Sequence, residues 1–182
     1  MHSRRCAMSL IEVTLVILVI GVLAAVAAPR FSDTLRVVRL EAAAKQLAAH
    51  IDYIRAVAIN EGRTTTLACN NSQQSYGCSS VDFPERTGVL LQVSVDQEYD
   101  PTFKLNANFD SSTTLSFDFE GVPRVGASAL ANGKIVLRSG KQRFAVIVAT
   151  GNGATRVVRL SDVGAGGGGD PDPFTEAPGA PT

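Results

Sequence analysis

The sequence predicts an α+β fold in which one long N-terminal helix packs on an antiparallel β-sheet. Two observations carry this prediction: helix-like hydrophobic patterning over residues 10–60, and a series of short strand-like segments over residues 64–160. The helix is expected to change along its length, from an apolar first half that spans a membrane to an amphipathic second half. A chain of 182 residues has room for one globular domain besides such an anchor.

The first half of the predicted helix is an apolar run over residues 10–28, dominated by Leu, Val, Ile and Ala. Its length is about what a helix needs to cross the hydrocarbon core of a bilayer. Glu12 is the only charged residue in the run. A carboxylate in a bilayer costs about 2.5–3.5 kcal/mol on insertion scales, so a simple anchor would be more stable with leucine there. Glu12 is therefore a candidate functional residue.

The second half of the helix begins after Pro29, which is expected to kink or loosen the helix. Beyond it, apolar residues recur mostly three to five positions apart, with charged and polar residues between them. This pattern predicts an amphipathic helix to about Asn60, with Gly62 as its stop signal. The apolar stripe needs a covering surface, which the rest of the chain must supply. The stripe consists of Leu35, Val38, Ala42, Leu47, Ile51, Ile54 and Ala58.

Seven short segments rich in Val, Leu, Phe and Thr follow and predict strands. They are residues 64–69, 88–96, 103–109, 114–119, 134–139, 143–150 and 154–160. Turn residues separate several of them, and residues 151–153 (Gly-Asn-Gly) give the strongest hairpin signal. Phe117 and Phe119 are expected on one face of their strand, with Asp118 and Glu120 on the other. Residues 161–182 are rich in Gly and Pro and predict a flexible tail.

Cysteine and histidine positions limit the chemistry that we expect. Cys69 and Cys78 enclose a short polar segment, and outside the cytosol the natural interpretation is one disulfide closing a small loop. A structural zinc site needs four nitrogen or sulfur ligands, and His50 is the only histidine apart from His2. His50 is expected at a boundary or on the surface. We predict no metal, no cofactor and no enzymatic site.

Charge patterning leaves two alternatives open. The formal net charge is zero, so no global signal points to nucleic acid. A DNA-contacting edge formed by basic residues near the C-terminal strands is one alternative, although no aromatic residues interleave with them and a solvated sheet face explains them equally. Acidic residues are the second alternative, as calcium ligands without EF-hand spacing. The basic residues are Arg138, Lys141, Arg143, Arg156 and Arg159, and the acidic ones are Asp96, Asp100, Asp110, Asp118 and Glu120.

The N-terminal sequence Arg4-Arg5-Cys6-Ala7, followed by Met8-Ser9-Leu10-Ile11-Glu12, the apolar run and Pro29, resembles the N-terminus of type IV prepilins and type II secretion pseudopilins. In that family a prepilin peptidase removes a short basic leader and the new N-terminal residue is methylated. The fifth mature residue is a glutamate, as Glu12 is when counted from Met8. The resemblance implies cleavage between Ala7 and Met8 and N-methylation of Met8. Two departures are Ala7 where glycine is usual and Met8 where phenylalanine is usual.

The resemblance also implies a domain organisation. Residues 1–7 are the leader, residues 8–29 the transmembrane half of the helix, residues 30–160 a periplasmic pilin-like domain and residues 161–182 the tail. The later strands resemble the minor pseudopilin H and FimT-like subgroup through residues 117–121 and the hairpin of residues 144–160.

The implied function is that of a minor pilin or pseudopilin, a structural subunit of a type IV pilus or type II secretion pseudopilus in the inner membrane. The implied partners are prepilin peptidase, other pilin or pseudopilin subunits and an inner-membrane assembly platform. Glu12 would neutralise the Met8 ammonium of a neighbouring subunit, and such a buried pair fixes register more than it adds stability. Two alternatives remain: a DNA- or ligand-binding minor pilin at a filament tip, and an ordinary signal anchor or secretory signal.

Overall fold

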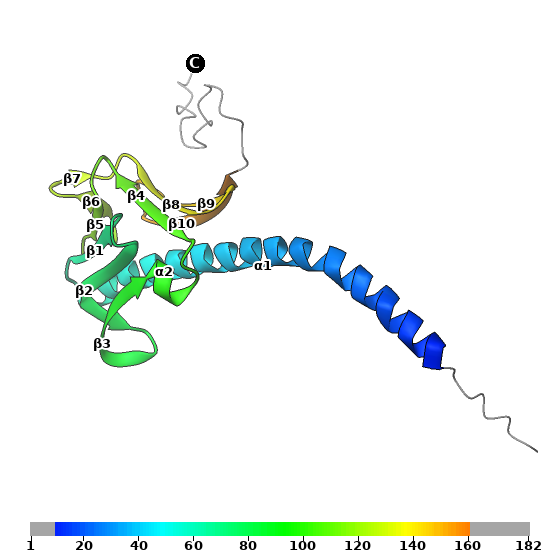
Figure 1. Ribbon diagram of the computed structural model, residues 1–182. Coiled ribbons are helices and arrows are strands. Elements are labelled where there is room, and N and C mark those ends of the chain that lie inside the picture. Colours follow the sequence, from blue (N-terminus) through cyan, green and yellow to red (C-terminus); the bar gives the residue numbers. More distant parts are fainter. Residues whose placement is uncertain (1–9, 161–182) are drawn as a thin grey trace, which may run out of the picture.

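The computed structural model describes residues 10–160, and within them the side chains of residues 10–25 and 34–160. Helix α1 (Leu10–Glu61) precedes ten strands and one short helix, α2 (Val95–Glu98), in this part of the chain. Figure 1 shows the C-terminal half of α1 against the strands and its N-terminal half projecting away from them. The predicted α+β class, with a long N-terminal helix on antiparallel strands, is confirmed.

Helix α1 ends at Glu61 because Gly62 adopts a left-handed backbone conformation with φ of 62°. The Arg63 amide donates a hydrogen bond to the Ala58 carbonyl at 3.1 Å, and the Gly62 amide donates to the Ile59 carbonyl at 3.4 Å. These two bonds form a Schellman motif, which satisfies carbonyl groups at the end of a helix. The stop signal predicted at Gly62 is confirmed.

Helix α1 runs through Pro29 without interruption, although the sequence predicts a kink or a loosening there. Proline removes one backbone hydrogen bond, and a long helix can absorb this loss by curving. Figure 1 shows a curved helix axis and no break in the ribbon.

The buried stripe of α1 agrees with the predicted one only in its C-terminal part. Leu47, Ile51, Ile54 and Ala58 are fully buried, as the periodicity predicts. Leu35 and Val38 are 39% and 57% exposed, however, and Ala42 is exposed as well. The first buried positions are instead Leu40, Ala43 and Ala44. The prediction was wrong here because the sheets fully bury α1 only from Leu40 onward, and among residues 34–39 only Val37 packs partly against the core.

The first sheet, sheet A, has six strands in the order β3-β2-β1-β5-β6-β7, and every neighbouring pair is antiparallel. Side chains that alternate along β1, such as Leu67 and Cys69, point into the core. The strands are β1 (Thr65–Asn70), β2 (Ser75–Phe83), β3 (Arg86–Ser94), β5 (Thr114–Phe117), β6 (Pro123–Val125) and β7 (Ser128–Ala129).

The second sheet, sheet B, has four antiparallel strands in the order β10-β9-β8-β4. Strands β9 and β10 form the hairpin that residues 151–153 predict, with Val148 opposite Thr155. Helix α1 contacts β1, β2 and β5 of sheet A and β8, β9 and β10 of sheet B, so both sheets share one core with it. The strands are β4 (Lys104–Phe109), β8 (Gly133–Ser139), β9 (Gln142–Val148) and β10 (Thr155–Leu160).

The turn between β1 and β2 joins the two sheets. The side-chain amide of Asn71 bonds to the backbone of Ala107 on β4, and the side-chain oxygen of Gln74 accepts a hydrogen bond from the Leu105 amide. Strand β4 is an edge strand of sheet B, so the backbone groups on its outer side have no partner strand in that sheet. The side chains of Asn71 and Gln74 form hydrogen bonds with some of these groups.

Four sequence expectations about the strands and their side chains were wrong. The single predicted sheet is two sheets, and strand β2 lies where only a polar loop was expected. The alternation of Phe117 and Phe119 also fails, since β5 ends at Phe117 and Phe119 is 60% exposed. Asp118, expected on an outer face, is buried, because its carboxylate accepts hydrogen bonds from the amides of Glu120 and Val122 and from Arg124.

Candidate functional site

The projecting N-terminal half of α1 is an uncovered apolar surface. Every residue from 10 to 25 is exposed, and Leu10, Ile11 and Leu18 are 81%, 73% and 66% exposed. The first fully buried residue of the helix is Leu40, which lies where the sheets begin. A row of large exposed apolar side chains of this length is unusual for a globular domain and marks a surface for a partner or a membrane. We call residues 10–25 the projecting segment.

Glu12 lies in the first turn of α1 and is the only charged residue of the projecting segment. A carboxylate in this position is stabilised by the positive end of the helix dipole. The next polar side chain, Thr14, donates a hydrogen bond from its hydroxyl to the Ile11 carbonyl at 2.9 Å, so the helix itself satisfies that group. The Glu12 carboxylate is left as the one ionisable group of the segment that a neighbouring molecule can engage.

The other N-terminal residues that the sequence singles out are only partly described. Ala7 and Met8 lie outside the described residues, and of Pro29 only its place inside α1 is described. By a combined criterion of helix length and hydropathy, no membrane-spanning helix is found among the described residues.

Cys69 and Cys78 do not form the predicted disulfide: both are buried free thiols. The pairing register gives the reason, since Cys69 lies opposite Tyr76 and Cys78 lies opposite Leu67. The two cysteines are therefore diagonal neighbours on β1 and β2, whereas a disulfide needs Cβ atoms about 3.5–4.5 Å apart. Burial raises the pKa of the Cys69 thiol to about 12, which keeps it protonated and unreactive.

His50 is buried on α1, so the expectation of a boundary or surface position was wrong. Its Nδ1 atom lies 2.9 Å from the Tyr76 hydroxyl oxygen of β2. Its ring packs edge to face against Phe83, with 5.9 Å between the ring centroids. Burial lowers the pKa of His50, which favours the neutral ring, although nearby Glu98 acts in the opposite direction. The histidine therefore anchors β2 to the helix, and the geometry shows no reacting group beside it.

The acidic residues weighed as calcium ligands do not form one cluster: Asp96 lies in α2, Asp118 and Glu120 share one turn, and Asp100 and Asp110 lie in two others. Asp110 accepts hydrogen bonds from the amides of Ala131 and Asn132, and Asp100 accepts from Thr102. Among the described residues, no group of three or more His, Cys, Asp or Glu side chains is placed to hold a metal ion.

The outer face of sheet B gathers most of the basic residues weighed as a DNA-contacting edge. Arg138, Arg143 and Arg156 lie there together with Lys104 and Lys134, which the sequence did not single out. Lys141 lies in the turn between β8 and β9, and Arg159 faces the other way, toward Glu41 of α1. Side chains alternate between the two faces of a strand, so only the pairing register of the strands could have predicted that Lys104 and Lys134 lie on this face. We call this surface the basic face.

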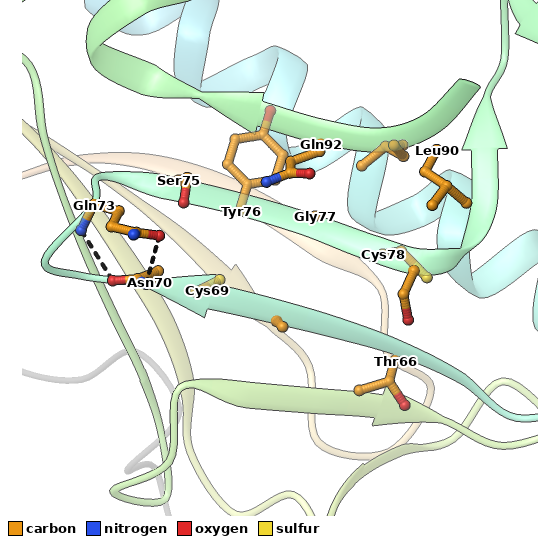
Figure 2. Close-up of a pocket in the computed structure, with 13 residues that line it drawn as sticks. Thr66, Cys69, Asn70, Gln73, Ser75, Tyr76, Gly77, Cys78, Leu90 and Gln92 are labelled. Atoms are coloured by element: carbon orange, nitrogen blue, oxygen red, sulfur yellow. Dashed lines mark hydrogen bonds between the residues drawn. The ribbon is translucent and has the colours of Figure 1, made fainter.

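The outer face of sheet A carries a shallow hollow of about 410 Å³ on strands β1, β2 and β3 (Figure 2). Gly77 lies in its middle, between Ala68 and Gln92 in the strand register. A Cβ atom at Gly77 would lie only 2.6 Å from the Leu91 carbonyl oxygen, so no larger residue fits. Neutral hydroxyl and amide groups, including those of Thr66, Asn70 and Ser75, line the hollow together with apolar side chains such as Ala68 and Leu90.

A long helix with an exposed apolar half, packed through its other half on antiparallel sheets, defines a protein of the pilin and pseudopilin class. The family model of the type II transport protein GspH matches residues 43–164. This match spans more than half of the chain, so the chain belongs to the GspH family. It is a minor pilin or pseudopilin of a type IV pilus or type II secretion system.

Two solved structures are similar to this chain. The type IV minor pilin FimU of Pseudomonas aeruginosa matches with 12% identity and a TM-score of 0.46, over 71% of this chain and 92% of that chain. The minor pseudopilin EpsH of the Vibrio cholerae type 2 secretion system matches with 9% identity and a TM-score of 0.49, over 66% of this chain and 97% of that chain. No curated protein sequence matches the chain.

Proposed function

We propose that this subunit is anchored in the inner membrane and assembled into a filament through the projecting segment of α1, with its globular domain in the periplasm. The exposed apolar side chains of residues 10–25, with one carboxylate among them, are the observation that carries this proposal. In the sequence, the apolar run that contains the projecting segment continues to residue 28, which is about the length that a helix needs to cross a bilayer. In this role the protein is a structural subunit and not an enzyme.

The proposal includes processing of the N-terminus. A prepilin peptidase would cut between Ala7 and Met8 and the Met8 amine would be methylated, as the leader sequence indicates. The new terminus would carry an ammonium group four residues before Glu12. The inner-membrane assembly platform and the other pilin or pseudopilin subunits are the remaining proposed partners.

The role of Glu12 follows from charge neutralisation. In an apolar surrounding, an isolated carboxylate and an isolated ammonium are both costly, while a pair of them is much less so. We infer that Glu12 of one subunit meets the Met8 ammonium of a neighbour when the helices pack side by side. The pair would exist only in the filament, so it would select the correct stagger between subunits.

Substitution of Glu12 tests this assembly role. Glu12→Leu should insert into the membrane at least as well as the wild type, because it removes a charge that is costly there. Its incorporation into filaments should fall, and Glu12→Gln should give an intermediate level because it keeps a hydrogen-bond acceptor. The measurement compares sheared filaments with the inner-membrane fraction. Glu41→Gln is the control on the same helix, since it removes an exposed charge that pairs with Lys45 and lies near Arg159.

Filament incorporation of Glu12→Leu equal to that of the wild type would remove Glu12 from the assembly contact. N-terminal mass analysis of protein from native membranes tests the processing step separately. An N-methylated Met8 is the expected terminus. A terminus near residue 28 would identify the segment as a secretory signal instead.

A second function, binding of DNA or another polyanion, is favoured by the basic face of sheet B. Five Lys and Arg side chains on one face of four neighbouring strands provide several phosphate contacts at once. A gel shift of the protein with duplex DNA over a salt series tests it. Affinity that falls steeply with salt and is lost in Lys134→Gln/Arg138→Gln would support it.

A further inference from the structure

The basic face of sheet B is a regular array of three rows. Its twelve outward positions are three on each strand, and among them are five Lys or Arg residues and no Asp or Glu. The first row is Lys104, Arg138, Arg143 and Leu160, the second is Asn106, Val136, Ala145 and Val158, and the third is Asn108, Lys134, Ile147 and Arg156. Between the two rows that carry the cations, the middle row offers two half-buried valines, Val136 and Val158, while Ala145 is fully buried.

The face is hollowed where β4 and β8 meet the turn between β1 and β2. A groove of about 610 Å³ lies there, with Asn71 and Gln74 on one side and Lys104, Lys134 and Arg138 on the other. This volume is in the range of sites that hold small ligands or short peptide segments. Its cations and amide groups favour an occupant that carries carboxylates or other anions.

The chain carries the matching charge in its C-terminal segment. Residues 161–182 include Asp162, Asp170, Asp172 and Glu176 and no Lys or Arg, although the whole chain is neutral. Three of these carboxylates lie within residues 170–176, together with Phe174 and two prolines. This short sequence pairs anionic with apolar side chains, which is the combination that half-buried valines between cationic rows bind.

The point where this segment leaves the fold places it beside the basic face. Leu160, the last residue of β10, belongs to the first row and lies opposite Arg143. With neighbouring strands about 4.8 Å apart, the face is roughly 14 Å across from β10 to β4. Nine residues, 161–169, separate Leu160 from residue 170, and nine residues reach at most about 30 Å. The linker is therefore long enough for residues 170–176 to reach any strand of the face.

We propose that residues 170–176 dock on the basic face of sheet B in the same molecule. Individual exposed ion pairs are weak, but a short linker that reaches the face gives an effective concentration of about a millimolar or more. A segment with only millimolar intrinsic affinity is then bound for much of the time. Docking would cover the cations of the face, so a polyanion or an acidic partner would have to displace the segment.

Carbodiimide cross-linking of the full-length protein in detergent micelles tests this proposal, because the reagent joins a carboxylate to a lysine amine in direct contact. Mass spectrometry should find Asp170, Asp172 or Glu176 joined to Lys104 and Lys134. The links should be lost in about 1 M salt, where the Debye length is near 3 Å. Lys45 on α1 is the internal control and should not be linked to these residues.

A matched pair of variants distinguishes cross-links that depend on docking at the basic face from nonspecific reaction of exposed lysines. Arg138→Gln/Arg143→Gln leaves both reacting lysines in place but removes two cations, so the cross-links should be lost. Arg86→Gln, on an exposed position of β3, should leave them unchanged. Links spread evenly over Lys45, Lys141 and the face lysines would overturn the proposal. Links formed only between differently isotope-labelled molecules would do the same and make a second copy the occupant.

The polyanion alternative is tested with Asp170→Asn/Asp172→Asn/Glu176→Gln. If the segment covers the face, this variant should bind duplex DNA more tightly than the wild type does. Equal affinity of the two proteins for duplex DNA would show that the segment does not compete for the face, and the proposal would be wrong.

Discussion

The side-chain amide of Asn71 forms two hydrogen bonds with the backbone of Ala107, a residue 36 positions away. Its Nδ2 group donates to the Ala107 carbonyl at 3.1 Å, and its Oδ1 atom accepts from the Ala107 amide at 2.8 Å. One side chain thereby takes the place that a neighbouring strand would occupy on the edge of sheet B. Unpaired strand edges promote association between chains, so this contact also protects β4.

Asn71→Ala should therefore destabilise the domain by about 1–2 kcal/mol, because two hydrogen bonds are lost and the backbone groups of Ala107 have only water as a replacement. Urea unfolding of a truncated protein that begins at Arg36, and so keeps the buried stripe from Leu40 onward, measures this change. Ser72→Ala in the same turn is the control and should stay within about 0.5 kcal/mol of the wild type. Equal effects of the two variants would contradict the role of Asn71.

Gly153→Ala should be more destabilising than Gly140→Ala, although both glycines have a left-handed backbone. The left-handed conformation alone costs a side chain about 1–2 kcal/mol, and this is all that Gly140→Ala should show. At Gly153 the new Cβ atom would also lie 2.9 Å from the Gly121 carbonyl oxygen and 2.9 Å from the Phe117 ring, which adds about 1–3 kcal/mol. Thermal unfolding of the two variants gives the difference, and equal melting temperatures would disprove the close contact.

The Asp118 carboxylate should make the stability depend on pH in the acid range. Burial opposes its ionisation, but the hydrogen bonds from Arg124 and from the amides of Val122 and Glu120 outweigh it and lower its pKa. A carboxyl with a lowered pKa in the folded state stabilises the fold above its unfolded pKa of about 3.9, and this contribution is lost as the pH falls through the folded pKa.

Asp118→Asn should therefore be about 1–3 kcal/mol less stable than the wild type at pH 7, with a difference that shrinks below pH 4. Chemical unfolding at several pH values measures it. Glu120→Gln, an exposed neighbour in the same turn, should follow the wild type at every pH. A difference for Asp118→Asn that is constant down to pH 2 would show that the charge of Asp118 is not the cause.

Cys69 and Cys78 should be found as thiols in protein purified from native cells without a reductant. Because burial raises the pKa of Cys69, iodoacetamide at pH 8 should modify it slowly in the folded protein and rapidly in urea. Mass analysis of the truncated protein should show two added groups after unfolding. If iodoacetamide modified neither cysteine in urea until a reductant was added, the protein would contain the disulfide.

The sequence predicts the elements with strong local signals. Helix α1 follows from its apolar and amphipathic patterns, its end from Gly62, and the last hairpin from residues 151–153. Strand β2 lacks such a signal, because Ser75, Gly77 and Ser79 are weak strand formers. It is a strand because β1 and β3 pair with it on both sides, which no local pattern reveals.

The site residues divide in the same way. Glu12 is evident from the sequence, since a charge inside an apolar run contradicts the run around it. The basic face is not, because Lys104 and Lys134 lie 30 residues apart in the sequence and come to the same face only through the pairing of β4 with β8. The burial of His50 likewise depends on a distant partner, Tyr76, whereas Asp118 is bonded within its own turn and to Arg124 six residues on, a local pattern that the sequence analysis missed.

Because α1 is continuous through Pro29, it fixes both the distance of Glu12 from the sheets and the rotation of Glu12 about the helix axis relative to them. Each residue of a helix advances about 1.5 Å and rotates about 100°, so Glu12 and the sheets keep one rotational phase about the helix axis. One residue inserted between the projecting segment and Leu40 would shift the length trivially but turn Glu12 through more than a quarter of a circle. Seven inserted residues would lengthen the helix by about 10 Å and rotate it by only about 20°. The helix thus fixes the direction of Glu12 about the helix axis relative to the two sheets.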